Sequence, residues 1–259
     1  LNEFVDAIVR GIKTPVKDFE DIGLFDTDGV AQQISTGILQ IENELYDIIR
    51  PKRAGPSGSR PATLLKESGI EYLELRGIDV NPFIPEGIDA NKMKLLDIYI
   101  IHSLISESPF ISRDEIEEIK VNQRVMVRNG RAKDVRLIRN GVLVPLSEIR
   151  NIFLDELEQT AKALDEYSEG YLSAFNSEMG LDLLPSEKIM QEIESSNLSF
   201  QDYGLKQSKN VAHSFFSNED LDFSALVTSA QTSLKDLKNL QENTGVDINK
   251  YVELYNSKI

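Results

Sequence analysis

The apolar residues of this chain change their spacing near residue 90, and this change is the strongest constraint on the fold. Up to that point they largely alternate, which is typical of β-strands, and most of the glycines and prolines lie there. Further along, apolar residues recur at helical spacing. The pattern predicts an α+β protein, with part of a sheet domain at residues 1–90 and a mainly helical region with one small hairpin at residues 91–259.

The first part contains two predicted strands, at Ile34–Ile49 and at Ile70–Val80. Between them we expect a basic loop at Arg50–Arg60 and a short helix at Pro61–Glu67. A helical pattern at Asn2–Ile12 precedes both strands, and the chain starts within it, on a Leu rather than a Met. We therefore expect a piece of a longer polypeptide, with a processed N-terminus as the alternative.

Local signals place the elements of the second part. Ser112 followed by Glu115 has the form of a capping box and predicts a helix start. The pair Asn140-Gly141 between two apolar runs predicts a hairpin. His102 lies on the apolar face of a predicted helix, where we expect it in the core or in a subunit contact. Further helices are expected at Ser147–Tyr167, Ser186–Ser195, Asp220–Gln241 and Asp247–Ser257.

Composition excludes several classes of function. Lys and Arg number 28 against 43 Asp and Glu, for a formal charge of −15, which disfavours nucleic acid as a partner. With no Cys and only two His, a zinc site or a thiol nucleophile is not expected. No apolar run approaches the roughly 20 residues of a membrane span. The absence of Cys is consistent with a cytoplasmic protein.

Two ionisable residues stand out on the second predicted strand. Alternation places Tyr72, Glu74 and Arg76 on one face. Burying a carboxylate and a guanidinium is costly unless they pair with each other or hold a ligand. The spacing alone leaves both interpretations open, an ordinary ion pair or a binding site.

The first predicted strand adds to this picture, because Glu42, Glu44 and Tyr46 would share one face there. Two strands would then present carboxylates and a phenol to a common surface. Clustered carboxylates suit Mg²⁺, and an Arg beside the metal suits the stabilisation of a transferring phosphoryl group. The alternative for Glu42 and Glu44 is a solvated strand face.

Three blocks of sequence together resemble a known family. They are LQIENELYDIIRPKR (Leu39–Arg53), GIEYLELRGIDVNPFIPEGID (Gly69–Asp89) and LLDIYIIHSL (Leu95–Leu104). They are similar to the proteobacterial type of glutamate–cysteine ligase, which carries out the first step of glutathione synthesis. The resemblance implies a glutamine-synthetase-like carboxylate–amine ligase fold, whose antiparallel sheet forms a funnel for ATP, metal and amino acids. It implies phosphorylation of the γ-carboxylate of glutamate by ATP, with Mg²⁺ or Mn²⁺, followed by attack of the cysteine amine.

The resemblance also implies roles for individual residues. Glu74 matches the family's magnesium-ligating glutamate, and Arg76 matches the catalytic arginine that contacts the transferred phosphoryl group of the nucleotide. Tyr46 matches a tyrosine of the amino-acid pocket. For Lys52, and for the two arginines at 53 and 60, only proximity to the active site is implied.

The chain departs from the family in length, because the family is roughly twice as long and its N-terminal half is absent here. That half supplies most of the metal-binding carboxylates, so we expect the 259 residues alone not to catalyse ligation. The missing half is thus an expected partner, with glutamate, cysteine and ATP. The alternatives are a related ligase with another amine acceptor, or a non-catalytic interaction domain in which Glu74 and Arg76 form a structural ion pair.

Overall fold

The computed structural model describes residues 1–56, 58–216, 223–242, 245 and 247–257. It contains two compact units, which are considered separately below. The first comprises the described residues of 1–79 and 220–259, and the second those of 80–219. The predicted division between residues 90 and 91 stays a prediction. The two compact units differ from this predicted division, because the first unit contains residues from both the beginning and the end of the chain.

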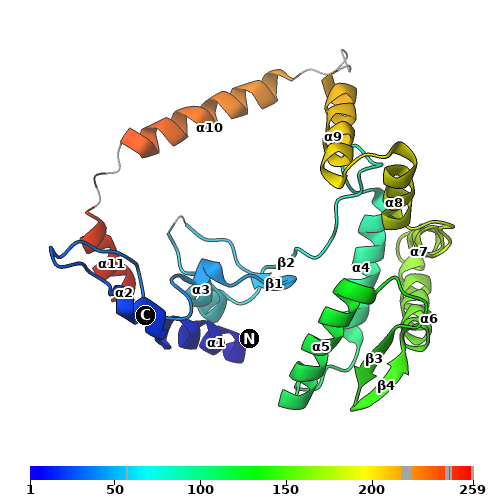
Figure 1. Ribbon diagram of the computed structural model, residues 1–259, viewed down its shortest axis with the longest axis horizontal. Coiled ribbons are helices and arrows are strands. Elements are labelled where there is room, and N and C mark those ends of the chain that lie inside the picture. Colours follow the sequence, from blue (N-terminus) through cyan, green and yellow to red (C-terminus); the bar gives the residue numbers. More distant parts are fainter. Residues whose placement is uncertain (57, 217–222, 243–244, 246, 258–259) are drawn as a thin grey trace. The chain divides into compact units, whose positions relative to one another are not determined.

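The first unit combines helices of different lengths with one small sheet (Figure 1). Its elements are α1 (Asn2–Lys13), α2 (Lys17–Ile22), the 3₁₀-helix η1 (Glu42–Glu44), β1 (Ile49–Lys52), α3 (Pro61–Ser68), β2 (Tyr72–Leu75), α10 (Ser224–Glu242) and α11 (Ile248–Asn256). Strands β1 and β2 are antiparallel. The core forms where α1 packs on α3, through Val5, Ile8, Ile12, Ala62 and Leu65.

The second unit is mostly helical (Figure 1). Its elements are α4 (Ala90–Ile105), α5 (Arg113–Asn129), β3 (Arg136–Arg139), β4 (Val142–Pro145), α6 (Leu146–Asp165), α7 (Tyr171–Met179), α8 (Pro185–Ser196) and α9 (Phe200–Phe216). Helices α4, α6 and α7 pack against one another around Ile98, Leu157, Ala161 and Phe175. None of the described helices has the length and apolar character needed to cross a lipid bilayer.

Most elements predicted from local signals are confirmed. The helix at the N-terminus, the short helix ended by Gly69, the capping box of α5 and the hairpin β3–β4 all form as expected. His102 lies mostly buried against Phe153 in the α4–α6 packing. The helix expected at Asp220–Gln241 is described from Ser224 onward, and its first predicted residues lie outside the described part.

The long strand predicted at Ile34–Ile49 is wrong. Side chains, rather than a neighbouring strand, satisfy much of its backbone: the Gln40 carboxamide oxygen accepts the amides of Ile34 and Ser35 at 3.0 and 2.9 Å. Gly37 brings this loop so close to α1 that an added Cβ would lie 1.9 Å from the carbonyl oxygen of Ile12. The strand begins only at Ile49, the last residue of the predicted strand, and it continues to Lys52, inside the segment predicted to be a basic loop. The second predicted strand is confirmed only in the first half of its range, as β2.

Candidate functional site

The pairing of β1 with β2 places several ionisable residues on one face of the small sheet. The register pairs Arg50 with Glu74 and Lys52 with Tyr72. Directly opposed residues of an antiparallel pair project to the same side. The pairing continues past β2, because the amide of Arg76 donates to the carbonyl of Ile48 at 2.7 Å. We call this side of the sheet the charged face; it carries Arg50, Lys52, Tyr72 and Glu74.

Glu74 lies between two guanidinium groups. Its Oε2 accepts hydrogen bonds from Nε and Nη2 of Arg50 at 3.1 and 2.6 Å, and its Oε1 accepts one from Nη2 of Arg76 at 2.8 Å. The hydrogen bond from Arg76, followed by that from Arg50, lowers the pKa of Glu74 to about 2. Glu74 is therefore a carboxylate across the physiological range, and the ion pair considered from the spacing is present in the structure.

Tyr46 joins this cluster from the loop between η1 and β1. Its ring centroid lies 4.5 Å from the guanidinium carbon of Arg76 and 5.0 Å from that of Arg50. Both distances are suitable for cation–π attraction. Arg50 also donates to the carbonyl of Leu45, which fixes the backbone next to Tyr46. The three residues named from the resemblance, Tyr46, Glu74 and Arg76, are thus brought together, and Arg50 contacts two of them.

Arg50 is the residue of this cluster that the sequence did not single out. It was expected only as one member of a basic loop, and its contact with Glu74 depends on the strand register. The alternation of Glu74 and Arg76 was visible in the sequence, whereas the cross-strand partner was not. The one available signal was the position of Arg50 at the start of a run of basic residues.

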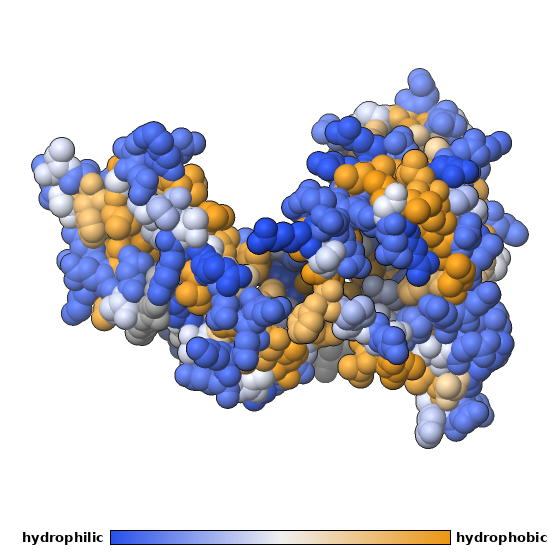
Figure 2. All heavy atoms as spheres, turned by 90° about the horizontal axis from the view of Figure 1, so that it is seen from below, coloured by the Kyte–Doolittle hydropathy of each residue, from blue (hydrophilic) through white to orange (hydrophobic). Residues whose placement is uncertain are grey.

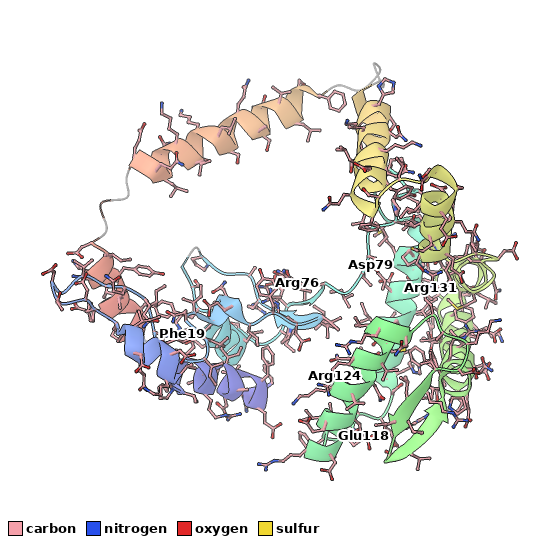
Figure 3. All side chains as sticks on the ribbon, viewed as in Figure 1. Phe19, Arg76, Asp79, Glu118, Arg124 and Arg131 are labelled. Carbon is pink, nitrogen blue, oxygen red and sulfur yellow. The ribbon has the colours of Figure 1, made fainter. Side chains whose placement is uncertain are left out.

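A pocket of about 170 Å³ opens beside the cluster. Arg76, labelled in Figure 3, lines it together with Tyr46, Arg50 and Lys52. Its other lining residues are Phe4, Ile8, Glu42, Asn43, Leu45, Pro51, Pro61 and Leu65. We call this space the tyrosine pocket. The lining combines cationic side chains with apolar ones, a combination suited to a small anionic molecule with an apolar part.

The shared face predicted for Glu42, Glu44 and Tyr46 is wrong. Glu42 has a side chain only 2% exposed, and it accepts hydrogen bonds from Nε of Arg60 and from the amide of Ala62, both at 2.7 Å. The second bond satisfies an amide in the first turn of α3. The Glu44 carboxylate instead accepts the amide of Gln40 at 2.6 Å. Neither Glu contributes to a common carboxylate surface with Glu74.

The described residues do not form a metal site by themselves. No group of three or more His, Cys, Asp or Glu side chains able to hold a metal ion occurs within the described part of the chain. Mg²⁺ prefers several oxygen ligands in octahedral geometry, and both oxygens of Glu74 already accept hydrogen bonds from guanidinium groups. The metal-binding role of Glu74 stays a prediction that requires ligands from outside these residues.

Comparisons with known proteins identify relatives of the whole chain. Residues 1–126 match the family described as glutamate–cysteine ligase. The chain is 31% identical over 269 aligned residues to a glutamate–cysteine ligase of Pseudomonas putida, covering 100% of the chain and 51% of the relative. To that of Alcanivorax borkumensis it is 33% identical, covering 86% and 44%. The chain spans about half the length of the curated relatives it matches.

A solved structure is also similar. The crystal structure of a glutamate–cysteine ligase from Francisella tularensis in complex with AMP superimposes with a TM-score of 0.84 at 27% sequence identity. The match covers 98% of this chain and 52% of that one. The similarity therefore extends beyond residues 1–126 to the helical second unit.

Proposed function

Because this chain belongs to the glutamate–cysteine ligase family, we propose that it forms the C-terminal portion of an enzyme that makes γ-glutamylcysteine from glutamate and cysteine with ATP. This reaction is the first step of glutathione synthesis, and we place it in the cytoplasm. The observation that carries the proposal is the cluster of Tyr46, Glu74 and Arg76 beside one pocket, within the residues that match the family.

In the proposed reaction, an oxygen of the γ-carboxylate of glutamate attacks the terminal phosphorus of ATP, and ADP leaves. The cysteine nitrogen then attacks the acyl carbon, loses a proton, and phosphate departs as the amide forms. Arg76 would hold the phosphoryl oxygens by charge-assisted hydrogen bonds, which are shorter and stronger than neutral ones. Glu74 orients that guanidinium by a hydrogen bond, and the ring of Tyr46 contacts it by cation–π attraction while lining the pocket for an amino-acid substrate.

We further propose that β1 and β2 belong to a larger antiparallel sheet of the glutamine-synthetase type. Each strand has only four residues, and a two-stranded sheet of this size is marginally stable on its own. The described residues also lack the carboxylates that a magnesium site needs. The N-terminal half of the enzyme would supply the remaining strands and ligands, and Mg²⁺ or Mn²⁺ bound there would neutralise phosphate charge.

Reconstitution tests the proposal. The 259-residue chain is mixed or fused with the N-terminal half of a related enzyme, and γ-glutamylcysteine is measured by mass spectrometry with and without ATP. We expect ATP-dependent product only with both halves. Product from the lone chain would contradict the need for the other half, and absence of product from the fused enzyme would contradict the ligase function. Serine and 2-aminobutyrate, compared with cysteine as acceptors, test for a ligase specific to another amine.

One observation favours a second candidate, a non-catalytic interaction domain. The ion pair between Glu74 and Arg76 is the arrangement that this alternative requires. Arg76→Met in the full-length enzyme separates the two functions. Loss of turnover with an unchanged melting temperature supports the ligase, whereas full turnover, or a loss of folding in parallel with turnover, supports the structural ion pair.

A further inference from the structure

Five basic residues lie on β1, in the segment after it and directly after β2. They differ in whether an acidic side chain pairs with them. Four have a partner: Arg50 and Arg76 with Glu74 at 2.6 and 2.8 Å, Arg60 with Glu42 at 2.7 Å, and Arg53 with Glu71 at 3.7 Å. The fifth, Lys52, has no acidic side chain within 4.0 Å among the described residues.

The position of Lys52 makes this difference relevant to the site. It is two residues from Arg50 on the same strand, so its side chain projects to the charged face, opposite Tyr72. It is half-buried and lines the tyrosine pocket with Tyr46 and Arg76. The arginines of the pocket are held in place by Glu74, whereas the ammonium group of Lys52 has no such restraint.

The charge balance of the pocket also favours the binding of an anion. Arg50, Lys52 and Arg76 carry three positive charges there, and Glu74 neutralises one of them. Glu42 also lines the pocket, but its charge is already paired with that of Arg60, so two positive charges remain. Like charges close together repel one another unless an anion lies between them. A chain with a net charge of −15 therefore has a locally cationic pocket, with one ammonium group free to bind.

We propose that Lys52 binds an anionic oxygen group of a substrate in the tyrosine pocket, either a carboxylate of an amino acid or a phosphate of the nucleotide. The proposal rests on the ligase function and adds a substrate-binding residue to it. A lysine ammonium is a compact charge with three donors on a flexible stem, so it can follow a group that moves or changes charge during a reaction.

Kinetics of the full-length enzyme test the proposal. Lys52→Met is compared with Lys66→Met, which removes an exposed lysine of α3 that does not line the pocket. We expect the Lys52 variant to raise one KM by about tenfold to a hundredfold, the usual effect of losing a hydrogen bond to a charged group. A raised KM for ATP assigns the phosphate, and a raised KM for glutamate or cysteine assigns the carboxylate. Three unchanged KM values would overturn the proposal.

Two further variants and one direct measurement separate binding from folding. Lys52→Arg keeps the positive charge and should recover most of the affinity for the substrate that Lys52→Met loses, whereas Lys52→Glu should not. Equal KM values for the Arg and Glu variants would mean that Lys52 only keeps a strand edge soluble, and would refute the binding role. If the full-length enzyme makes no γ-glutamylcysteine, the ligase function fails, but Lys52 can still be assessed in this chain. Its ¹³C-dimethylated lysine signal should then shift on titration with inorganic phosphate or glutamate, and no shift with either would overturn the proposal.

Discussion

The ion pairs of Glu74 lead to a quantitative prediction about its pKa. The pKa lies at about 2 instead of 4.5, with the hydrogen bond from Arg76 as the largest cause and that from Arg50 as the next. Arg76→Met should therefore raise the pKa of Glu74 more than Arg50→Met does. Replacing both should raise it by up to about 2.5 pH units, the difference between the two values. Titration of the ¹³C-labelled side-chain carboxyl by NMR measures each value directly.

The same pKa determines how stability depends on pH. Because the folded-state pKa of Glu74 is below its unfolded value, its pairing stabilises the fold fully above about pH 4.5 and loses this effect as the pH falls toward 2. The difference in stability between wild type and the double variant should shrink over that window. Lys120→Met, which removes the partner of Glu117, is the control and should leave the Glu74 titration unchanged. Titration of wild-type Glu74 near 4.5, or a larger effect of Arg50 than of Arg76, would refute the reasoning.

Three further predictions concern stability. Glu42→Ala should lower the free energy of unfolding in urea by about 3–5 kcal/mol, because it leaves the guanidinium of Arg60, whose side chain is only 9% exposed, without its acidic partner. Glu44→Ala should change it by less than about 0.5 kcal/mol. Ser112→Ala should cost about 1 kcal/mol in thermal unfolding, through loss of the capping box; no change would show that the cap is replaced by water. Gly141→Val should cost about 1–2 kcal/mol in the same assay, because φ there is 76°, and an unchanged melting temperature would contradict this strain.

Elements of the fold that depend on neighbours in the sequence could be predicted, and those that depend on distant residues could not. The capping box of Ser112 and the hairpin of Asn140 act within a few residues, and both are present. Helix α11, in contrast, packs on the first part of the chain through Asn249, whose amide group bonds the backbone of Gly29 and Ala31. More than two hundred residues separate these partners, and no local pattern indicates their contact.

The candidate site shows the same division. Alternation along a strand was enough to predict that Glu74 and Arg76 share a face, and the structure adds that they are hydrogen-bonded. Tyr46 was predicted on a strand but reaches the cluster from a loop, since η1 and the side-chain bonds of Glu42 replace the expected strand. The contribution of Arg50 required the register of two strands, which depends on how the chain pairs rather than on any single segment.

Each face of the small sheet has a property that a further partner would compensate, excess positive charge on one and exposed apolar residues on the other. These two properties connect the fold to the proposed enzyme. On the charged face, positive charge exceeds negative charge beside the tyrosine pocket. On the other face, Ile49 and Leu73 remain 43% and 42% exposed, and Figure 2 shows apolar side chains among the polar ones at the molecular surface. Exposed apolar strand residues and free strand edges are costly for a protein that remains alone in water. Added strands would cover the apolar face, whereas an anionic substrate would balance the positive charge of the charged face. The exposed apolar surface and the excess charge would thus be compensated by different partners. A partner half without substrate should therefore stabilise the sheet while leaving the pocket cationic and ready to bind.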